Sequence, residues 1–219
     1  MSDADAPRTA NPAELRARAA VLDAADPLAA YTAQFVPGDD LVAYLDGNSL
    51  GRPVANLPAA LDGFVRTQWA GRLIRGWDEL WLTRPREIGD RIGAACLGAA
   101  SGQTIVADST TVLIFKLLRA AIADQQAVDA KRDELVVLAD EFPTDRYIVE
   151  RLADDHGLTV RWVDAPLDAG ITPELAAEVV GPRTIVALFS GVAYRSAWWA
   201  DMAEVTRVVQ AAGARVVWD

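Results

Sequence analysis

The second half of the chain alternates short apolar runs with longer stretches of helical periodicity. Runs of four to six residues that are apolar on both faces predict strands at 104–107, 134–139, 159–163, 184–189 and 215–218. Between these runs, apolar spacing predicts helices over 110–123, 143–156, 173–180 and 199–212. Buried strands that alternate with helices are typical of a largely parallel sheet covered by helices. We therefore expect an α/β fold over residues 103–219.

The first 102 residues follow a different pattern, in which helices predominate. Residues 1–11 are polar and predict a disordered tail. The remainder predicts helices at 12–33, 53–69 and 85–100, a short strand at 42–45 with a turn at 46–51, and a tryptophan-rich connector at 69–81. So many tryptophans without a sheet to cover indicate that residues 12–102 pack against another part of the protein.

Composition narrows the class of protein. Twenty-one Lys and Arg residues against 31 Asp and Glu give a net charge of -10, which argues against a general nucleic-acid binder. The single cysteine, Cys96, excludes an intramolecular disulfide and fits a reducing compartment. No apolar run reaches the roughly 18 residues of a membrane span, and the acidic start lacks the basic region of a signal peptide. We expect a cytoplasmic protein that binds neither membrane nor nucleic acid.

Candidate chemistry lies directly after the predicted strands, because ligands of open α/β sheets bind beyond the carboxyl ends of their strands. Ser109, Thr110 and Thr111 open the helix that follows the first run. The free N–H groups and the dipole of a helix start attract an anion such as phosphate. Ser and Thr are also preferred helix caps, so this segment alone favours plain capping.

Two further strand ends carry groups that suit a flat heterocycle. Phe142, Pro143, Thr144 and Asp145 follow the second run, and Asp219 follows the last. An aromatic ring stacks on a heterocycle, and a carboxylate pairs with its ring nitrogen. The same residues also suit the first turn of a helix, where acidic groups are favoured, and Asp219 also fits the start of a loop.

Other ligand classes have little support. The chain contains neither G-x-G-x-x-G nor G-x-x-x-x-G-K-[ST], which disfavours a dinucleotide or P-loop site. The only histidine, His156, precedes Gly157 at a predicted helix end, where capping is its expected role. With one histidine and one cysteine, a zinc site of the usual ligand type is improbable, and we expect no metal.

Taken together, six segments resemble kynureninases, both in their amino-acid sequences and in their order along the chain. They are Y-L-D-G-N-S-L-G at 44–51, G-R-L-I-R-G-W at 71–77, A-D-S-T-T at 107–111, E-F-P-T-D-R-Y at 141–147, V-A-Y-R-S at 192–196 and V-V-W-D at 216–219. D-G-N-S-L-G and F-P-T-D-R-Y are the specific ones, and the resemblance runs from about residue 25 to the end.

The resemblance implies an enzyme that depends on pyridoxal 5'-phosphate (PLP) and has the aspartate-aminotransferase fold. The resemblance further implies a homodimer that hydrolyses L-kynurenine, or 3-hydroxykynurenine, to anthranilate, or 3-hydroxyanthranilate, and L-alanine. The reaction belongs to tryptophan catabolism and NAD biosynthesis. The resemblance also implies that residues 12–102 contribute to the small domain and the dimer interface. Residues 103–219 would be the first part of the PLP-binding large domain.

Individual residues carry over by matching positions. Ser109 and Thr110 match the phosphate-binding positions, Phe142 the aromatic ring that stacks on the cofactor, and Asp145 the carboxylate beside it. Asp219 matches the partner of the pyridine nitrogen. The resemblance further implies cofactor contacts at Pro143, Thr144 and Ser190, and a turn bordering the substrate pocket at Asn48 and Ser49.

The chain departs from the family in length and in its lysines. Kynureninases are roughly twice as long, and the chain stops straight after an apolar run, so we expect an incomplete N-terminal half. The only lysines, Lys116 and Lys131, match no Schiff-base position. We therefore expect no catalytic lysine in this chain and no activity from it alone. Two alternatives stay open: another PLP enzyme of the same fold, such as a cysteine desulfurase, and a non-catalytic PLP-fold fragment.

Overall fold

The computed structural model describes residues 11–38, 41, 43–166 and 168–219. These fall into two compact units, one up to Arg84 and one over Pro85–Asp219. The predicted tail at 1–11 lies outside the described residues except for Asn11, and so does Val42 of the predicted strand at 42–45.

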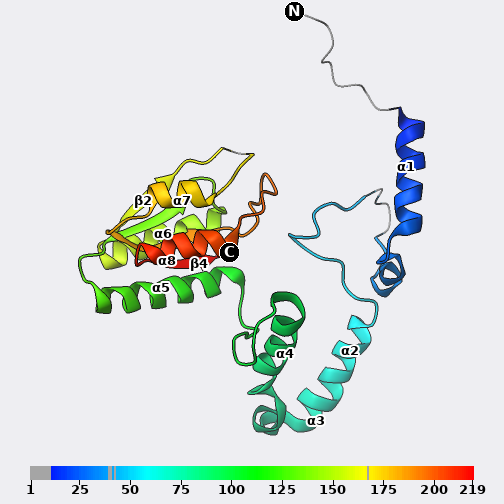
Figure 1. Ribbon diagram of the computed structural model, residues 1–219. Helices are drawn as coiled ribbons and strands as arrows, with labels where there is room; N and C mark the ends of the chain where they lie inside the picture. Colours follow the sequence, from blue (N-terminus) through cyan, green and yellow to red (C-terminus); the bar gives the residue numbers. More distant parts are fainter. Residues whose placement is uncertain (1–10, 39–40, 42, 167) are drawn as a thin grey trace, which may run out of the picture. The chain divides into compact units, whose positions relative to one another are not determined.

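The first unit is built from short helices (Figure 1). They are α1 (Pro12–Ala25), η1 (Ala29–Gln34), α2 (Leu57–Gly63), η2 (Phe64–Trp69), α3 (Ala70–Arg72), η3 (Leu73–Arg75) and η4 (Trp77–Trp81). Asn11 caps α1 through its side chain, which accepts a hydrogen bond of 3.0 Å from the Ala13 N–H. None of these helices buries a side chain.

Three predictions in this unit were wrong. The helix predicted from Pro53 begins only at Leu57, since Val54 forms a bridge instead. The helix predicted over 12–33 breaks after Ala25, because Pro27 lacks an N–H and the chain continues as the separate turn η1. Residues 43–45 form no strand, since none of their backbone groups enters a ladder. Elsewhere in this unit, Phe35 and Val54 form an isolated antiparallel β-bridge.

The second unit contains a four-stranded parallel sheet (Figure 1). It begins with α4 (Arg84–Ile92) and η5 (Gly93–Leu97), followed by α5 (Thr110–Val128). β1 (Glu134–Leu138), α6 (Pro143–His156), β2 (Thr159–Val163), α7 (Pro173–Val179), β3 (Thr184–Phe189), α8 (Met202–Ala211) and β4 (Arg215–Trp218) complete it. The strand order is β2-β1-β3-β4.

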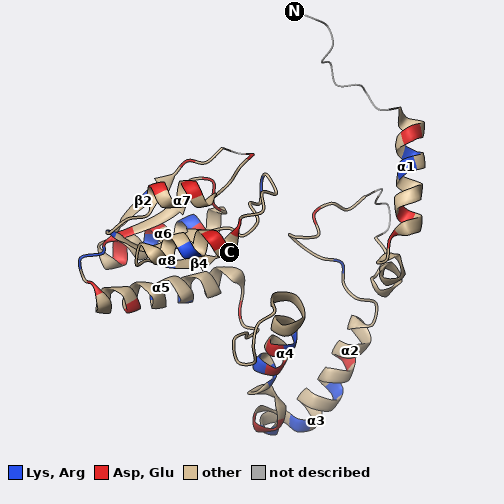
Figure 2. Ribbon diagram, viewed as in Figure 1, with Lys and Arg blue, Asp and Glu red and all other residues tan. Residues whose placement is uncertain are grey.

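Helices cover both faces of this sheet. Leu135 and Val137 pack with α5 and α6, whereas Val136 and Leu138 pack with α7 and α8, because successive strand residues point to opposite faces. All six residues of β3 are buried, as expected for one of the two strands that have a neighbour on each side. Charged residues are spread along the helices in Figure 2. The α/β prediction with a mostly parallel sheet is confirmed.

The sequence pattern was wrong about one strand and about one helix start in this unit. Residues 104–107 form no strand: the Val106 N–H bonds to the Pro85 carbonyl at 3.0 Å, and no neighbouring strand among the described residues pairs with this run. The helix predicted from residue 199 begins at Met202, because the Asp201 side chain caps it and Trp199 forms a bridge with Val192.

Candidate functional site

The connections of the sheet create a crevice at one end of it. α6 leaves β1 toward one face, and α8 leaves β3 toward the other, so the winding direction changes between these adjacent strands. In open α/β sheets, such a switch point is where ligands bind, outside the carboxyl ends of the strands. The residues that follow β1 and β3 are therefore the candidate site.

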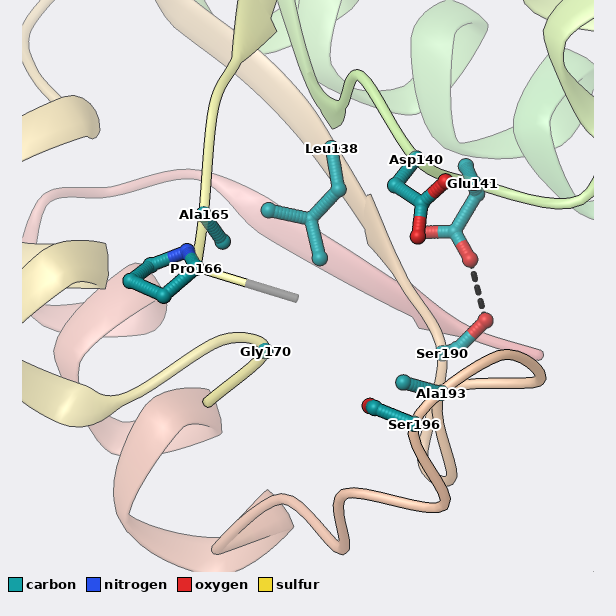
Figure 3. A pocket seen from close by; sticks show the side chains of 9 residues that line it. All are labelled: Leu138, Asp140, Glu141, Ala165, Pro166, Gly170, Ser190, Ala193 and Ser196. Atoms are coloured by element: carbon teal, nitrogen blue, oxygen red, sulfur yellow. Dashed lines mark hydrogen bonds between the residues drawn. The ribbon is translucent and has the colours of Figure 1, made fainter. Parts of the chain in front are cut away.

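A buried pair of side chains joins the two strand ends. The Ser190 hydroxyl, just after β3, hydrogen-bonds Oε1 of Glu141, just after β1 (Figure 3). Glu141 is 3% exposed and Ser190 is 7% exposed. Glu141 Oε2 has no hydrogen-bond partner among the described residues. Both residues line a pocket whose walls include Leu138, Ala165, Pro166, Gly170 and Ala193.

Two more carboxylates belong to this cluster. Asp145 lies in the first turn of α6, is 1% exposed, and leaves Oδ2 without a partner among the described residues. Asp219 follows β4, and its backbone bonds on both sides to the end of β3: its N–H donates to Phe189 O at 3.0 Å, and its carbonyl accepts from Gly191 N–H at 2.8 Å. Glu141, Asp145, Ser190 and Asp219 are thus brought to one edge of the sheet.

Burial raises the pKa of all three acids, and repulsion between charges adds to the rise for Glu141 and Asp145. Burial raises the pKa of Glu141 to about 7; hydrogen bonds from Ser190 oppose the rise, and the charges of Asp145 and Asp219 add to it. Burial and the charge of Asp219 raise the pKa of Asp145 to about 6, against a hydrogen bond from Thr144. Desolvation also raises the pKa of Asp219. Among the described residues, no salt bridge joins Glu141, Asp145 or Asp219 to a cationic side chain.

An aromatic pair lies beside the cluster. Phe142 is 43% exposed, and its ring forms a T-shaped pair with the Tyr194 ring, with centroids 5.2 Å apart and planes at 76°. The loop that carries Tyr194 is held by an ion pair of 2.6 Å between Arg195 and Asp140. Phe142, the residue after Glu141, therefore leaves part of its side chain exposed while its ring contacts Tyr194. Pro143 is the first residue of α6.

The predicted phosphate-binding residues begin α5. The Ser109 hydroxyl caps this 19-residue helix by accepting from the Val112 N–H at 3.4 Å, and Thr110 is its first residue. Both are exposed. Neither makes a described contact with the acids, so their role in a common site stays a prediction.

Asn48 and Ser49 belong to the first unit. They lie in an exposed turn that the Ser49 hydroxyl closes by donating 2.7 Å to Asp46 Oδ1, and Tyr44 braces the turn with a bond of 2.7 Å to Leu50 O. Their place beside a substrate stays a prediction.

The lysines are engaged elsewhere. Lys116 forms an ion pair with Asp108, the residue before the cap of α5. Lys131 lies exposed in the turn before β1, with its N–H bonded to Asp129 at 3.0 Å.

In the described part of the chain, no group of three histidine, cysteine or acidic side chains is arranged to hold a metal ion. None of its helices is long and apolar enough to cross a bilayer.

Sequence reasoning missed Glu141 as a site residue. Its acidic side chain immediately precedes Phe142, and this position after a strand was the available signal. What the sequence did not reveal is its partner, because Ser190 lies 49 residues later and reaches it only through the pairing of β1 with β3.

Comparison with known structures supports the fold. The structure is similar to a cysteine desulfurase from Thermococcus onnurineus, with a TM-score of 0.61 and 18% sequence identity. The match covers 81% of this chain and 44% of that one. A NifS-like protein matches with a TM-score of 0.59 at 14% identity, over 75% of this chain and 45% of that one. The second unit is therefore an α/β domain of the aspartate-aminotransferase fold.

No family model matches the chain. Among curated proteins, kynureninase from Burkholderia pseudomallei is 36% identical over 208 residues, which cover 93% of this chain and 48% of that protein. Kynureninase from Pseudomonas fluorescens is 36% identical over 202 residues, covering 90% of this chain and 46% of that protein. By sequence, therefore, the chain is similar to kynureninases over nearly its whole length, and it spans about half the length of the curated relatives that it matches.

Proposed function

We propose that this chain is the cofactor-holding part of a PLP-dependent kynureninase. The whole enzyme would hydrolyse L-kynurenine or 3-hydroxykynurenine to anthranilate or 3-hydroxyanthranilate and L-alanine, as a cytoplasmic homodimer in tryptophan catabolism and NAD biosynthesis. The observation that carries the proposal is the identity of 36% to kynureninases over 93% of the chain.

The chemistry of the strand ends fits a phosphorylated pyridine. A buried carboxylate oxygen of Asp145 lacks a partner among the described residues, and a protonated ring nitrogen is the kind of cation that the acid cluster accepts. Phe142, directly after Glu141 and two residues before Thr144, has an aromatic side chain that is partly exposed. The start of α5 supplies N–H groups and hydroxyls for a phosphate.

Each group has a role that its surroundings support. Asp219, at the end of β4, would hold the ring nitrogen in its protonated form, and Asp145 would add negative charge beside it. Phe142 would stack on the ring and keep water from one side. Ser109 and Thr110 would bind the phosphate. When bound, PLP supplies an electron sink for negative charge that develops at the substrate α carbon.

The lysines of the chain do not supply the amine that this chemistry needs. Lys116 is held by Asp108 and Lys131 lies in a surface turn, so neither offers a free amine at the acid cluster. We therefore expect the 219-residue chain to bind PLP weakly, to form no borohydride-reducible lysine adduct in stoichiometric amount, and to release no anthranilate from kynurenine by itself.

A fused protein tests the proposal. Residues 1–219 would be joined to the part of Pseudomonas fluorescens kynureninase that this chain does not match. We expect the fusion to bind PLP with a reducible imine absorbance and to release fluorescent anthranilate from L-kynurenine. Asp219→Asn in the fusion should lower the rate at least about a hundredfold, because the ring nitrogen loses its carboxylate.

Two alternatives have separate outcomes in the same experiment. A fusion that releases alanine and sulfur from L-cysteine but no anthranilate would indicate a desulfurase; the desulfurase likeness, at 18% identity, concerns the fold alone. A 219-residue chain that binds PLP tightly with unchanged affinity after Asp219→Asn would indicate a non-catalytic binding protein instead.

A further inference from the structure

The Glu141–Ser190 pair does more than connect two strands. Both side chains are buried at the switch point between β1 and β3, and their hydrogen bond joins residues 49 positions apart (Figure 3). A serine hydroxyl has one hydrogen to donate and two lone pairs to accept with. The partner of the Ser190 hydroxyl therefore decides whether its hydrogen or only its lone pairs remain available to a ligand.

The protonation state of Glu141 makes that decision. An ionised carboxylate only accepts, so Ser190 must direct its hydrogen to Glu141 Oε1 and can offer only lone pairs to a ligand. A protonated Glu141 can donate to the Ser190 oxygen instead, which frees the Ser190 hydrogen for a ligand. The unpartnered Oε2 of Glu141 gives the acid no competing donor or acceptor among the described residues.

The residues around Glu141 bring the gain or loss of its proton into the neutral pH range. Asp145 on α6 and Asp219 after β4 both repel the ionised form of Glu141. Asp140, which lines the same pocket, forms an ion pair with Arg195 at 2.6 Å, so these two charges largely offset each other. With burial added, the pKa of Glu141 rises to about 7.

We propose that Glu141 is a positioning residue that sets whether Ser190 donates or accepts a hydrogen bond toward a ligand at the carboxyl ends of β1 and β3. Taking that ligand to be a heteroaromatic ring with polar substituents rests on the proposed function. Glu141 itself touches the hydroxyl and not the ligand, and it reverses the hydrogen-bonding polarity of the site as it gains or loses its proton.

The first test needs no ligand. The 219-residue chain would be labelled with ¹³C at Glu side-chain carboxyls and titrated by NMR, with Glu141 assigned by its loss in Glu141→Gln. We expect its midpoint near pH 7. Ser190→Ala should move the midpoint further up, because the hydrogen bond that stabilises the carboxylate is lost. Ser190→Thr keeps a hydroxyl and should restore the midpoint.

A matched control separates this effect from general disturbance of the pocket. Ser196 lines the same pocket but bonds the Trp198 N–H at 3.2 Å, so Ser196→Ala should leave the Glu141 midpoint unchanged. A Glu141 midpoint near 4.5, its ordinary value, or one that Ser190→Ala does not move, would overturn the proposal.

The second test measures PLP affinity by quenching of tryptophan fluorescence between pH 6 and pH 8. The quantity is the ratio of dissociation constants for Ser190→Ala and the unchanged chain, in which the titration of PLP itself cancels. We expect this ratio to change about twofold to tenfold across the range, as one hydrogen bond allows. In the Glu141→Gln background it should be constant.

The two proposals fail separately. If Glu141 titrates as described but neither the chain nor the fused protein binds PLP at any pH, the proposed function is contradicted, whereas the relation between Glu141 and Ser190 stands. If PLP binds and the ratio changes equally in both backgrounds, Glu141 does not act on Ser190, and this inference is contradicted alone.

Discussion

The two units of the chain differ in what their apolar side chains contact. Within residues 85–219, the strands bury their side chains in two layers, one under α5 and α6 and one under α7 and α8. Among the described residues up to Arg84, the helices bury no side chain, and Leu45 and Ile74 are 93% and 77% exposed. Helical structure and a hydrophobic core are therefore separate properties, and only the second unit has both.

The largest expected effect concerns each unit in isolation. Residues 85–219 should unfold cooperatively in urea with a free energy of unfolding of about 5 kcal/mol or more, because two layers of buried side chains must be exposed together. Residues 1–84 should lose their helical circular dichroism gradually. A cooperative transition in residues 1–84 would contradict the comparison.

Single side chains should reproduce the same contrast. Leu188→Ala, at a fully buried position of β3, should lower the free energy of unfolding of the chain by about 2–5 kcal/mol through lost burial and the cavity left behind. Ile74→Ala, the matched change in the first unit, should alter it by less than about 0.5 kcal/mol. Urea denaturation measures both, and equal effects would show that Ile74 is not exposed in solution.

Buried acids should give the second unit a dependence on pH. The pKa of Glu141 is 4.5 when unfolded and about 7 when folded, so the unfolded state loses its proton first as pH rises. The stabilisation from this group is therefore complete below about pH 4.5, and roughly 3 kcal/mol of it is lost as pH rises from there through 7.

Glu141→Gln should remove this part of the fall, leaving the smaller part due to Asp145. Glu150→Gln, on the exposed side of α6, is the matched control and should preserve the wild-type profile. Unfolding free energies measured from pH 4.5 to pH 8 decide the matter, and identical profiles for Glu141→Gln and the unchanged chain would contradict it.

Helix caps should give the smallest effect. The Thr172 hydroxyl accepts from the Leu175 N–H at 3.2 Å and starts α7, which buries Ala176 and Val179. Thr172→Ala should lower the free energy of unfolding by about 1 kcal/mol. Asn11→Ala, at α1, should reduce local helicity without shifting the cooperative transition, since α1 has no buried side chain. A shift with Asn11→Ala would indicate that α1 unfolds together with the core.

Patterns in the sequence predicted the elements that contribute to the sheet. β2, β3 and β4 have the predicted bounds, because each combines a short apolar run with clear breaks on either side. The run at 104–107 looked the same but forms no strand, since a strand exists only where a neighbour completes its hydrogen bonds. Local composition carries no information about that neighbour.

The same limit applies to the candidate site. Strand ends could be located from the sequence, and with them Phe142, Asp145, Ser190 and Asp219. The hydrogen bond between Glu141 and Ser190 could not, because it depends on which strands lie side by side. Whether the start of α5 joins this site is equally a question of distance between elements rather than of residue type.

The strand order has a consequence for folding kinetics. β1 and β2 are joined through α6 alone, and β3 and β4 through α8 alone, so each pair closes a short loop. Pairing β1 with β3 instead brings together segments about 50 residues apart, as in the partners Glu134 and Thr184, at a greater cost in chain entropy. We expect the two halves to form early and their junction to be the rate-limiting step. The crevice between β1 and β3 would then be the last part of the sheet to assemble.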